Sequence, residues 1–235
     1  MLASRFRAHA QLNGVLRRTV TTLSNNSDIK AFPAPHAPGV HILTYLNTDP
    51  PNWDLAIGTT NELPPTPKSF KGNDRFLEIL NDVLRQNAHK DDDLKSQAQA
   101  FASPGGSTLG SGGVFFPQQR RQRGSKVSGA GLGGGGGAGG GGAGGASAQG
   151  GAGGGGVGGW VHLSDRRNPP DFGRIAWPED ILGSVEVDSH GNLQDNFQPS
   201  GTYRVVTNEG ILGLTPFIKD KLVQRLREEE RKAQS

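Results

Sequence analysis

The stretch NDRFLEILNDVLRQNAH, residues 73–89, carries the clearest helical pattern in the first half of the chain. Its large apolar side chains recur every three or four residues, so a helix places them on one face. They are Phe76, Leu77, Ile79, Leu80, Val83 and Leu84. Asn73 precedes them, and asparagine is a favoured N-cap because its side chain accepts a hydrogen bond from the first turn. The stretch therefore predicts an amphipathic helix that must bury one face against other elements.

Two segments upstream of this helix predict strands. Residues 40–46 (VHILTYL) and 53–59 (WDLAIGT) contain the β-branched and aromatic side chains that strands favour. Residues 47–52 lie between them and predict a turn. These two strands and the helix form the first half of the predicted fold, residues 40–102.

The flanks of this first half predict exposed chain. Residues 28–39 contain the run FPAPHAP at 32–38, and its prolines predict an extended spacer instead of a strand or helix. Three consecutive aspartates at 91–93 predict a solvated end to the helical pattern.

The second half of the chain predicts short strands joined by tight turns. Residues 160–164 (WVHLS) and 184–188 predict strands. The Ser-His-Gly-Asn turn that follows contains Gly191, which can adopt the positive φ that such turns need. Residues 202–207 and 211–214 predict a second hairpin.

The chain ends in a predicted helix with recognisable start signals. Thr215 is a suitable N-cap, and Pro216 fits the first helical position, where its missing N–H costs nothing. The apolar residues on one face of this helix are Phe217, Ile218, Leu222, Val223 and Leu226. The helix is expected to run to about Lys232, with the charged EEERK segment in solvent.

Residues 103–159 separate the two halves and hold most of the 37 glycines. Such a composition buries too little apolar surface to offset the entropy of ordering, so it predicts a long disordered insertion. Either half alone, residues 40–102 or 160–235, would have a thin core. We therefore predict one α+β domain built from both halves, with a small, mostly antiparallel sheet and two amphipathic helices. Two small separate domains are the alternative.

Charge and composition restrict the possible functions. The net charge is +3, but residues 1–27 and 103–159 each contain four basic residues and no acid. The remaining segments are net acidic, which argues against a broadly basic nucleic-acid-binding domain. The absence of cysteine excludes disulfides, cysteine-ligated metals and thiol nucleophiles. The sequence contains no run of about 18 apolar residues, so it predicts no conventional transmembrane helix.

The opening residues 1–27, MLASRFRAHAQLNGVLRRTVTTLSNNS, match a mitochondrial presequence in being arginine-rich, acid-free and rich in hydroxyl residues. A helix would place an apolar side opposite its basic flank, which suits import receptors and the membrane potential. This predicts import through residues 1–27, cleavage between Arg18 and Ser27, and a location in the matrix, free or peripheral to the inner membrane. A disordered basic tail is the alternative.

Signatures of common catalytic chemistry are missing from the sequence. It contains no GxxxxGK[ST] phosphate loop, no GxSxG elbow leading into a helix and no HExxH motif. The six histidines form no i, i+4 pair of the kind that binds metal on a helix. We therefore expect no cofactor and no metal site, and a non-enzymatic role is favoured over an enzyme.

The stretch SDRRNPPDFGR, residues 164–174, is the strongest candidate site because it follows a predicted strand and is stiffened by two prolines. Arginine forks bind carboxylate or phosphate, and aromatic residues anchor protein partners. With neighbouring residues, the candidates for partner or anion binding are His162, Asp165, Arg166, Arg167, Asp171, Phe172, Arg174 and Trp177. Alternatively, the aspartates and arginines pair with one another and hold an irregular loop.

Three functions are compatible with these features. The favoured hypothesis is a non-enzymatic mitochondrial protein that binds another protein or complex, as an assembly, translation or stability factor. The second is a small matrix enzyme or small-molecule binder that recognises an anionic ligand. The third is RNA or ribosome association through the basic cluster at 115–126, where two phenylalanines precede three arginines and a lysine.

Overall fold

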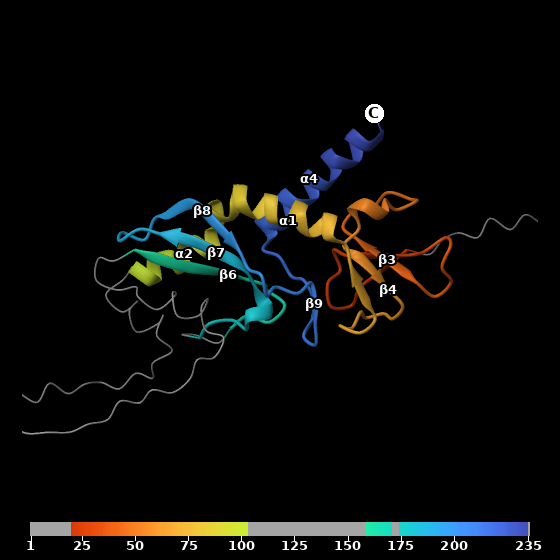
Figure 1. The fold of residues 1–235 in the computed structure, drawn as a ribbon, viewed down its shortest axis with the longest axis horizontal. Coiled ribbons are helices and arrows are strands. Elements are labelled where there is room, and N and C mark those ends of the chain that lie inside the picture. Colours follow the sequence, from red (N-terminus) through yellow and green to blue (C-terminus); the bar gives the residue numbers. More distant parts are fainter. Residues whose placement is uncertain (1–19, 103–157, 171–173, 235) are drawn as a thin grey trace, which may run out of the picture.

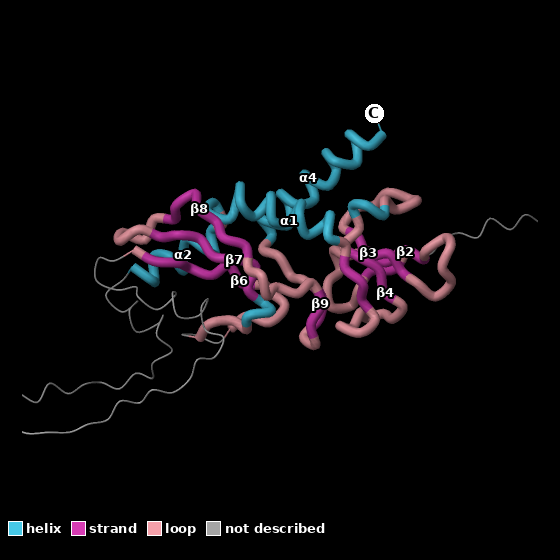
Figure 2. The backbone as a smooth tube through the Cα atoms, viewed as in Figure 1, coloured by secondary structure: helices cyan, strands magenta, loops and turns pink. Residues whose placement is uncertain are grey.

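Two antiparallel sheets lie at opposite ends of the molecule, and helices connect them (Figure 1). The computed structural model describes residues 20–102, 158–170 and 174–234. Figure 2 shows the same chain coloured by secondary structure, with helices between the two groups of strands. The described residues thus form the mixed helix and antiparallel-strand architecture that the sequence predicts, with three α-helices among them where two were expected.

The first sheet is a five-stranded meander in which each strand pairs antiparallel with the next one along the chain. Ile42 and Leu43 of its central strand are completely buried on opposite faces. The strands are β1 (Thr21–Thr22), β2 (Lys30–Pro33), β3 (His41–Thr44), β4 (Gly58–Thr60) and β5 (Phe70–Gly72).

Two expectations about this region were wrong in detail. The predicted spacer contains β2, whose Phe32 is buried, because a proline at the strand's last residue is compatible with pairing. The predicted strand at 53–59 begins as the 3-10 helix η1 (Trp53–Leu55), since Asn52 caps that turn. The end of the predicted presequence contains β1, so the described fold already begins within residues 1–27.

Helix α1 (Asp74–Asn87) confirms the strongest sequence prediction. The side chain of Asn73 caps it by accepting a hydrogen bond from the backbone N–H of Arg75 at 3.0 Å. The same side chain donates to the carbonyl of Ala56 at 2.8 Å, which joins the helix to the first sheet. Five of the six predicted apolar residues are fully buried, and Leu77 packs at the edge of the core.

Helix α2 (Asp92–Ala102) replaces the solvated acidic end that was expected after α1. A one-turn 3-10 helix, η2 (Ala88–Lys90), precedes it. Asp91 is buried, and its Oδ1 accepts hydrogen bonds from the backbone N–H groups of Asp93 and Leu94. The expectation failed because the first aspartate caps a helix and only the following ones face solvent.

The second half supplies a three-stranded antiparallel sheet and a hairpin. Gly191 has φ of +84° in the turn between the second and third strands, as its position predicted. The strands are β6 (Gly159–Ser164), β7 (Ile181–Val187), β8 (Leu193–Pro199), β9 (Val206–Thr207) and β10 (Gly210–Ile211), and the 3-10 helix η4 (Pro178–Asp180) precedes β7.

Helix α4 (Pro216–Gln234) begins where the sequence predicted. The hydroxyl of Thr215 accepts a hydrogen bond from the N–H of Ile218 at 3.3 Å. It also donates to Oδ2 of Asp91 at 2.5 Å. The caps of α2 and α4 are therefore hydrogen-bonded to each other, although they lie in different halves of the chain.

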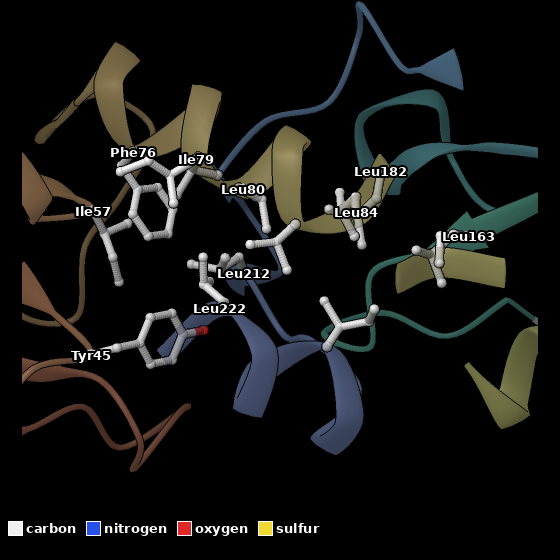
Figure 3. Packing of buried hydrophobic residues seen from close by; sticks show 14 of the residues in the cluster. Tyr45, Ile57, Phe76, Ile79, Leu80, Leu84, Leu163, Leu182, Leu212 and Leu222 are labelled. Atoms are coloured by element: carbon white, nitrogen blue, oxygen red, sulfur yellow. The ribbon is translucent and has the colours of Figure 1, made fainter. Parts of the chain in front are cut away.

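One cluster of buried apolar side chains extends through both halves (Figure 3). Helix α1 packs against α4 and β8, and α2 packs against β6. The labelled side chains of Figure 3 include Phe76 and Leu84 from the first half and Leu163, Leu182 and Leu222 from the second. The two halves share one core.

The ends of the predicted insertion lie next to each other. Residues 103–157 are outside the described residues, and the predicted range also includes Gly159, which begins β6. A Cβ on Gly159 would lie 2.6 Å from the ring of Phe101 near the end of α2, so these two residues are in close contact. A short linker can therefore join the two halves.

Replacing residues 103–157 with a flexible linker of about eight residues should leave the fold intact. If the insertion is the flexible coil that its composition predicts, shortening it lowers the entropy cost of loop closure by about 1–2 kcal/mol. Urea unfolding should show an equal or higher free energy of unfolding with an unchanged m-value. Loss of cooperative unfolding would contradict the shared core.

Changing Asp91→Ala should lower the free energy of unfolding by about 2 kcal/mol, because it removes one cap and leaves a buried hydroxyl without its acceptor. The matched control is Asp82→Ala, whose carboxylate forms an exposed pair with Arg85 at 2.8 Å. That change should cost less than about 0.5 kcal/mol. Equal effects of the two substitutions in urea unfolding would disprove the role of the cap pair.

Candidate functional site

All of the candidate residues except His162, which lies on β6, come between β6 and β7, on the irregular segment that ends in η4. Asp171 and Phe172 fall outside the described residues. The other candidates divide into two groups, because some side chains point into the protein and others lie at its surface.

Asp165 is buried, and both of its carboxylate oxygens have hydrogen-bond partners. Oδ1 accepts from the backbone N–H of Arg167 at 2.9 Å and from that of Gly213 at 2.8 Å. Oδ2 accepts from the hydroxyl of Tyr203 at 2.9 Å. The backbone N–H of Asp165 donates to the carbonyl of Asp180 at 2.7 Å. Asp165 therefore fixes the start of the loop to three other parts of the second half.

Arg167 is the centre of this cluster, with 3% of its side chain exposed. Its Nε donates to Oδ1 of Asp180 at 2.7 Å. Its Nη1 donates to the carbonyl of Val205 and its Nη2 to that of Glu179, each at 2.9 Å. The guanidinium also lies 5.5 Å from the ring centroid of Tyr203, within the range of a cation–π contact. We refer to Asp165, Arg167, Asp180 and Tyr203 as the buried cluster.

Burial dominates the electrostatics of the buried cluster. It raises the pKa of Asp165, and the charge of Arg167 together with the surrounding N–H and O–H donors opposes that rise. Burial and the nearby Asp165 carboxylate also raise the pKa of the Tyr203 hydroxyl well above its usual value. The tyrosine is therefore protonated at neutral pH and acts as a hydrogen-bond donor to the carboxylate.

The structure shows Asp165 and Arg167 paired within the chain. This is the alternative to partner or anion binding that was stated above. Their side chains bond to other groups of the chain, and these bonds hold the loop. The structure does not bring them together with the surface candidates as one binding surface.

The surface candidates are Arg166, Arg174 and Trp177. The side chain of Arg166 is 54% exposed, and its Nη1 lies 3.8 Å from Oδ2 of Asp93 at the start of α2. Arg174 is exposed, and Trp177 is 70% exposed. Ile175, which was not among the candidates, is an exposed large apolar side chain beside them.

His162 lies on β6, directly across from Ser184 of β7. Its Nδ1 is 2.8 Å from the Ser184 hydroxyl. Burial lowers the pKa of the imidazole, so the ring is neutral at physiological pH. His162 thus forms a cross-strand pair with Ser184 instead of joining the buried cluster.

Sequence reasoning missed Asp180 and Tyr203. Asp180 follows Arg167 by 13 residues and Tyr203 follows Asp165 by 38, and no local spacing relates them. The one available signal is that several charged residues occur in a proline-rich segment too irregular to satisfy them through regular secondary structure.

No group of three or more His, Asp or Glu side chains in the described part of the chain is arranged to hold a metal ion. Among the helices of the described residues, none has the length and apolar content needed to cross a bilayer. Comparison with protein-family models, curated proteins and solved structures gave no match.

Changing Arg167→Met should destabilise the protein by about 3–5 kcal/mol, because it leaves the buried Asp180 carboxylate without its cation. Arg166→Met is the matched control at the adjacent position and should change the free energy of unfolding by less than about 0.5 kcal/mol. Both values can be measured by urea unfolding followed by circular dichroism. A mild effect of Arg167→Met would show that the buried cluster does not hold the loop.

Proposed function

We propose that the protein is a non-enzymatic mitochondrial accessory protein that binds another protein through residues 174–178, here called the Trp177 segment. The observation that carries this proposal is the 70% exposure of Trp177. Tryptophan has a large apolar surface and is enriched among the residues that dominate binding energy at protein interfaces. Leaving that surface in water forfeits free energy that a partner could recover.

The backbone that presents Trp177 is held in place by the rest of the fold. Its carbonyl accepts a hydrogen bond from the N–H of Asp180 at 2.8 Å, and Asp180 is bound by Arg167. The next carbonyl, that of Pro178, accepts from the Thr202 hydroxyl at 2.8 Å. A side chain on a fixed backbone loses less conformational entropy on binding, which favours affinity. The buried cluster therefore supports the Trp177 segment.

The charges around this segment indicate the chemistry of the partner. Arg174 lies in the segment, and Arg204 lies beside it, because its backbone N–H donates to the carbonyl of the adjacent Glu179 at 3.1 Å. Both arginine side chains are exposed. We infer a partner protein with an apolar pocket for the indole ring and carboxylates at the rim of that pocket.

The anion-binding hypothesis receives less support from the geometry. His162 and Asp165, two of the four residues on which it depends, already bond to groups within the chain. The RNA hypothesis depends on residues 115–126, which lie outside the described residues.

Mitochondrial location is part of the same proposal and is supported by the composition of residues 1–27, with four arginines and no acid. The partner would accordingly be a matrix protein or a complex on the matrix side of the inner membrane, where an assembly, translation or stability factor acts.

The binding proposal can be tested with tagged variants in isolated mitochondria. Wild-type protein should migrate on native gels in a particle larger than the monomer, and mass spectrometry should identify a constant partner. Trp177→Ala should weaken binding to that partner by about 30-fold, as for an interface hot spot, and move the protein to the free position. Its melting temperature should stay unchanged, because the side chain is exposed.

Trp53→Ala is the matched control, since Trp53 is 46% exposed and lies in η1, between β3 and β4 of the first sheet. It should leave migration unchanged. Migration of the wild type as a monomer, or equal behaviour of the two variants, would refute binding through the Trp177 segment.

A further inference from the structure

The start of the described chain is part of the fold. Thr21 and Thr22 of β1 pair antiparallel with Ala31 and Lys30 of β2. Leu23 follows them with 4% exposure and belongs to the main apolar core. These contacts give the residues directly after position 20 a structural role.

The next few residues join the first sheet to the second half of the chain. The Asn26 side chain donates to the carbonyl of Leu212, after β10, at 2.9 Å. The Asp28 carboxylate pairs with Lys219 of α4 at 2.9 Å. Residues 20–28 therefore contact β2, α4 and the residue after β10, and their removal would break all of these contacts.

The arginines of the predicted targeting signal end just before this segment. All four arginines of residues 1–27 lie at or before Arg18, and the chain has no acid until Asp28. The apolar and basic pattern that predicts an amphipathic import helix also ends at Arg18. Only Thr19 and Val20 separate that residue from β1.

We propose that the targeting peptide is removed by one cut between Arg18 and Thr21, so that the mature chain begins at Thr19, Val20 or Thr21. The reaction is hydrolysis of one peptide bond. Water supplies a hydroxyl to the carbonyl carbon of the residue before the cut and a proton to the nitrogen after it. The inference rests on the mitochondrial import proposed above.

A cut nearer Ser27 would remove residues that belong to the fold and so destabilise the protein. Removing Leu23 takes a buried leucine out of the shared core, and losing β1 exposes the edge of β2. Removing Asn26 leaves the Leu212 carbonyl without that donor. The structure thus narrows the window of Arg18 to Ser27 expected from the sequence to its first few residues.

The test is mass spectrometry of the N-terminal peptide of the endogenous protein purified from mitochondria. The expected peptide begins at Thr19, Val20 or Thr21. A mature chain that begins at Thr22 or later, one that begins before Thr19, or an intact Met1 would overturn the cut. These outcomes are independent of the gel assay for Trp177, so failure of one proposal is distinguishable from failure of the other.

The structural reason for the boundary can be tested separately in the mature chain. Leu23→Ala should lower the melting temperature by about 5–15 °C, because a fully buried leucine is truncated. Val20→Ala is the matched control, since Val20 is among the exposed apolar residues. It should shift the melting temperature by less than about 2 °C. Equal shifts would remove the argument that the fold begins at this point.

Discussion

The shared core around α1 is the constraint on which the rest of this structure depends. Each half of the chain is too small to bury an extensive apolar core alone. Helix α1 comes from the first half, yet it packs against α4 and β8 from the second. The two halves must therefore fold together, whatever the length of the segment between them. This explains how a long glycine-rich stretch can interrupt the sequence without interrupting the fold, since Phe101 and Gly159 at its ends are in contact.

Polar contacts fix the relative orientation of the elements that the apolar core holds together. Hydrophobic burial alone is non-directional, so it does not fix how one element is rotated against another. Three contacts between distant parts of the sequence do so: Thr215 with Asp91, Asn26 with Leu212, and Lys219 with Asp28. The contact of Thr215 with Asp91 is buried, where the loss of a partner strongly lowers stability. The pair of Lys219 and Asp28 is at the surface, where it contributes little. All three involve α4 or the chain just before it, so this helix is oriented against both the first sheet and α2.

The sequence predicts the elements whose signals are local and misses those whose partners are distant. Helices α1 and α4 follow from apolar spacing and from their caps, Asn73 and Thr215. Helix α2 does not, because Asp91 resembles a solvated aspartate until its contact with Thr215, 124 residues away, is known. Strand β2 was not predicted, because the prolines near Phe32 indicated an extended spacer. At the candidate site, composition selected a loop but could not tell Arg166 from Arg167. These neighbours have the same chemistry, and only the tertiary fold places one at the surface and the other inside.

The buried cluster holds its loop with an ion pair that carries a large desolvation penalty, and this penalty bears on function. An ion pair such as Arg167 with Asp180 must recover a large desolvation cost, and apolar residues of similar volume often stabilise a protein as well or better. The ion pair contributes by fixing the geometry of the backbone. The planar guanidinium bonds to Asp180 and to the carbonyls of Glu179 and Val205 at once, which fixes the backbone on either side of η4. Trp177 lies at the start of that fixed backbone with most of its ring in solvent. A buried ion pair that fixes the backbone next to an exposed indole is what we expect if the position of that indole matters to a partner, as proposed above.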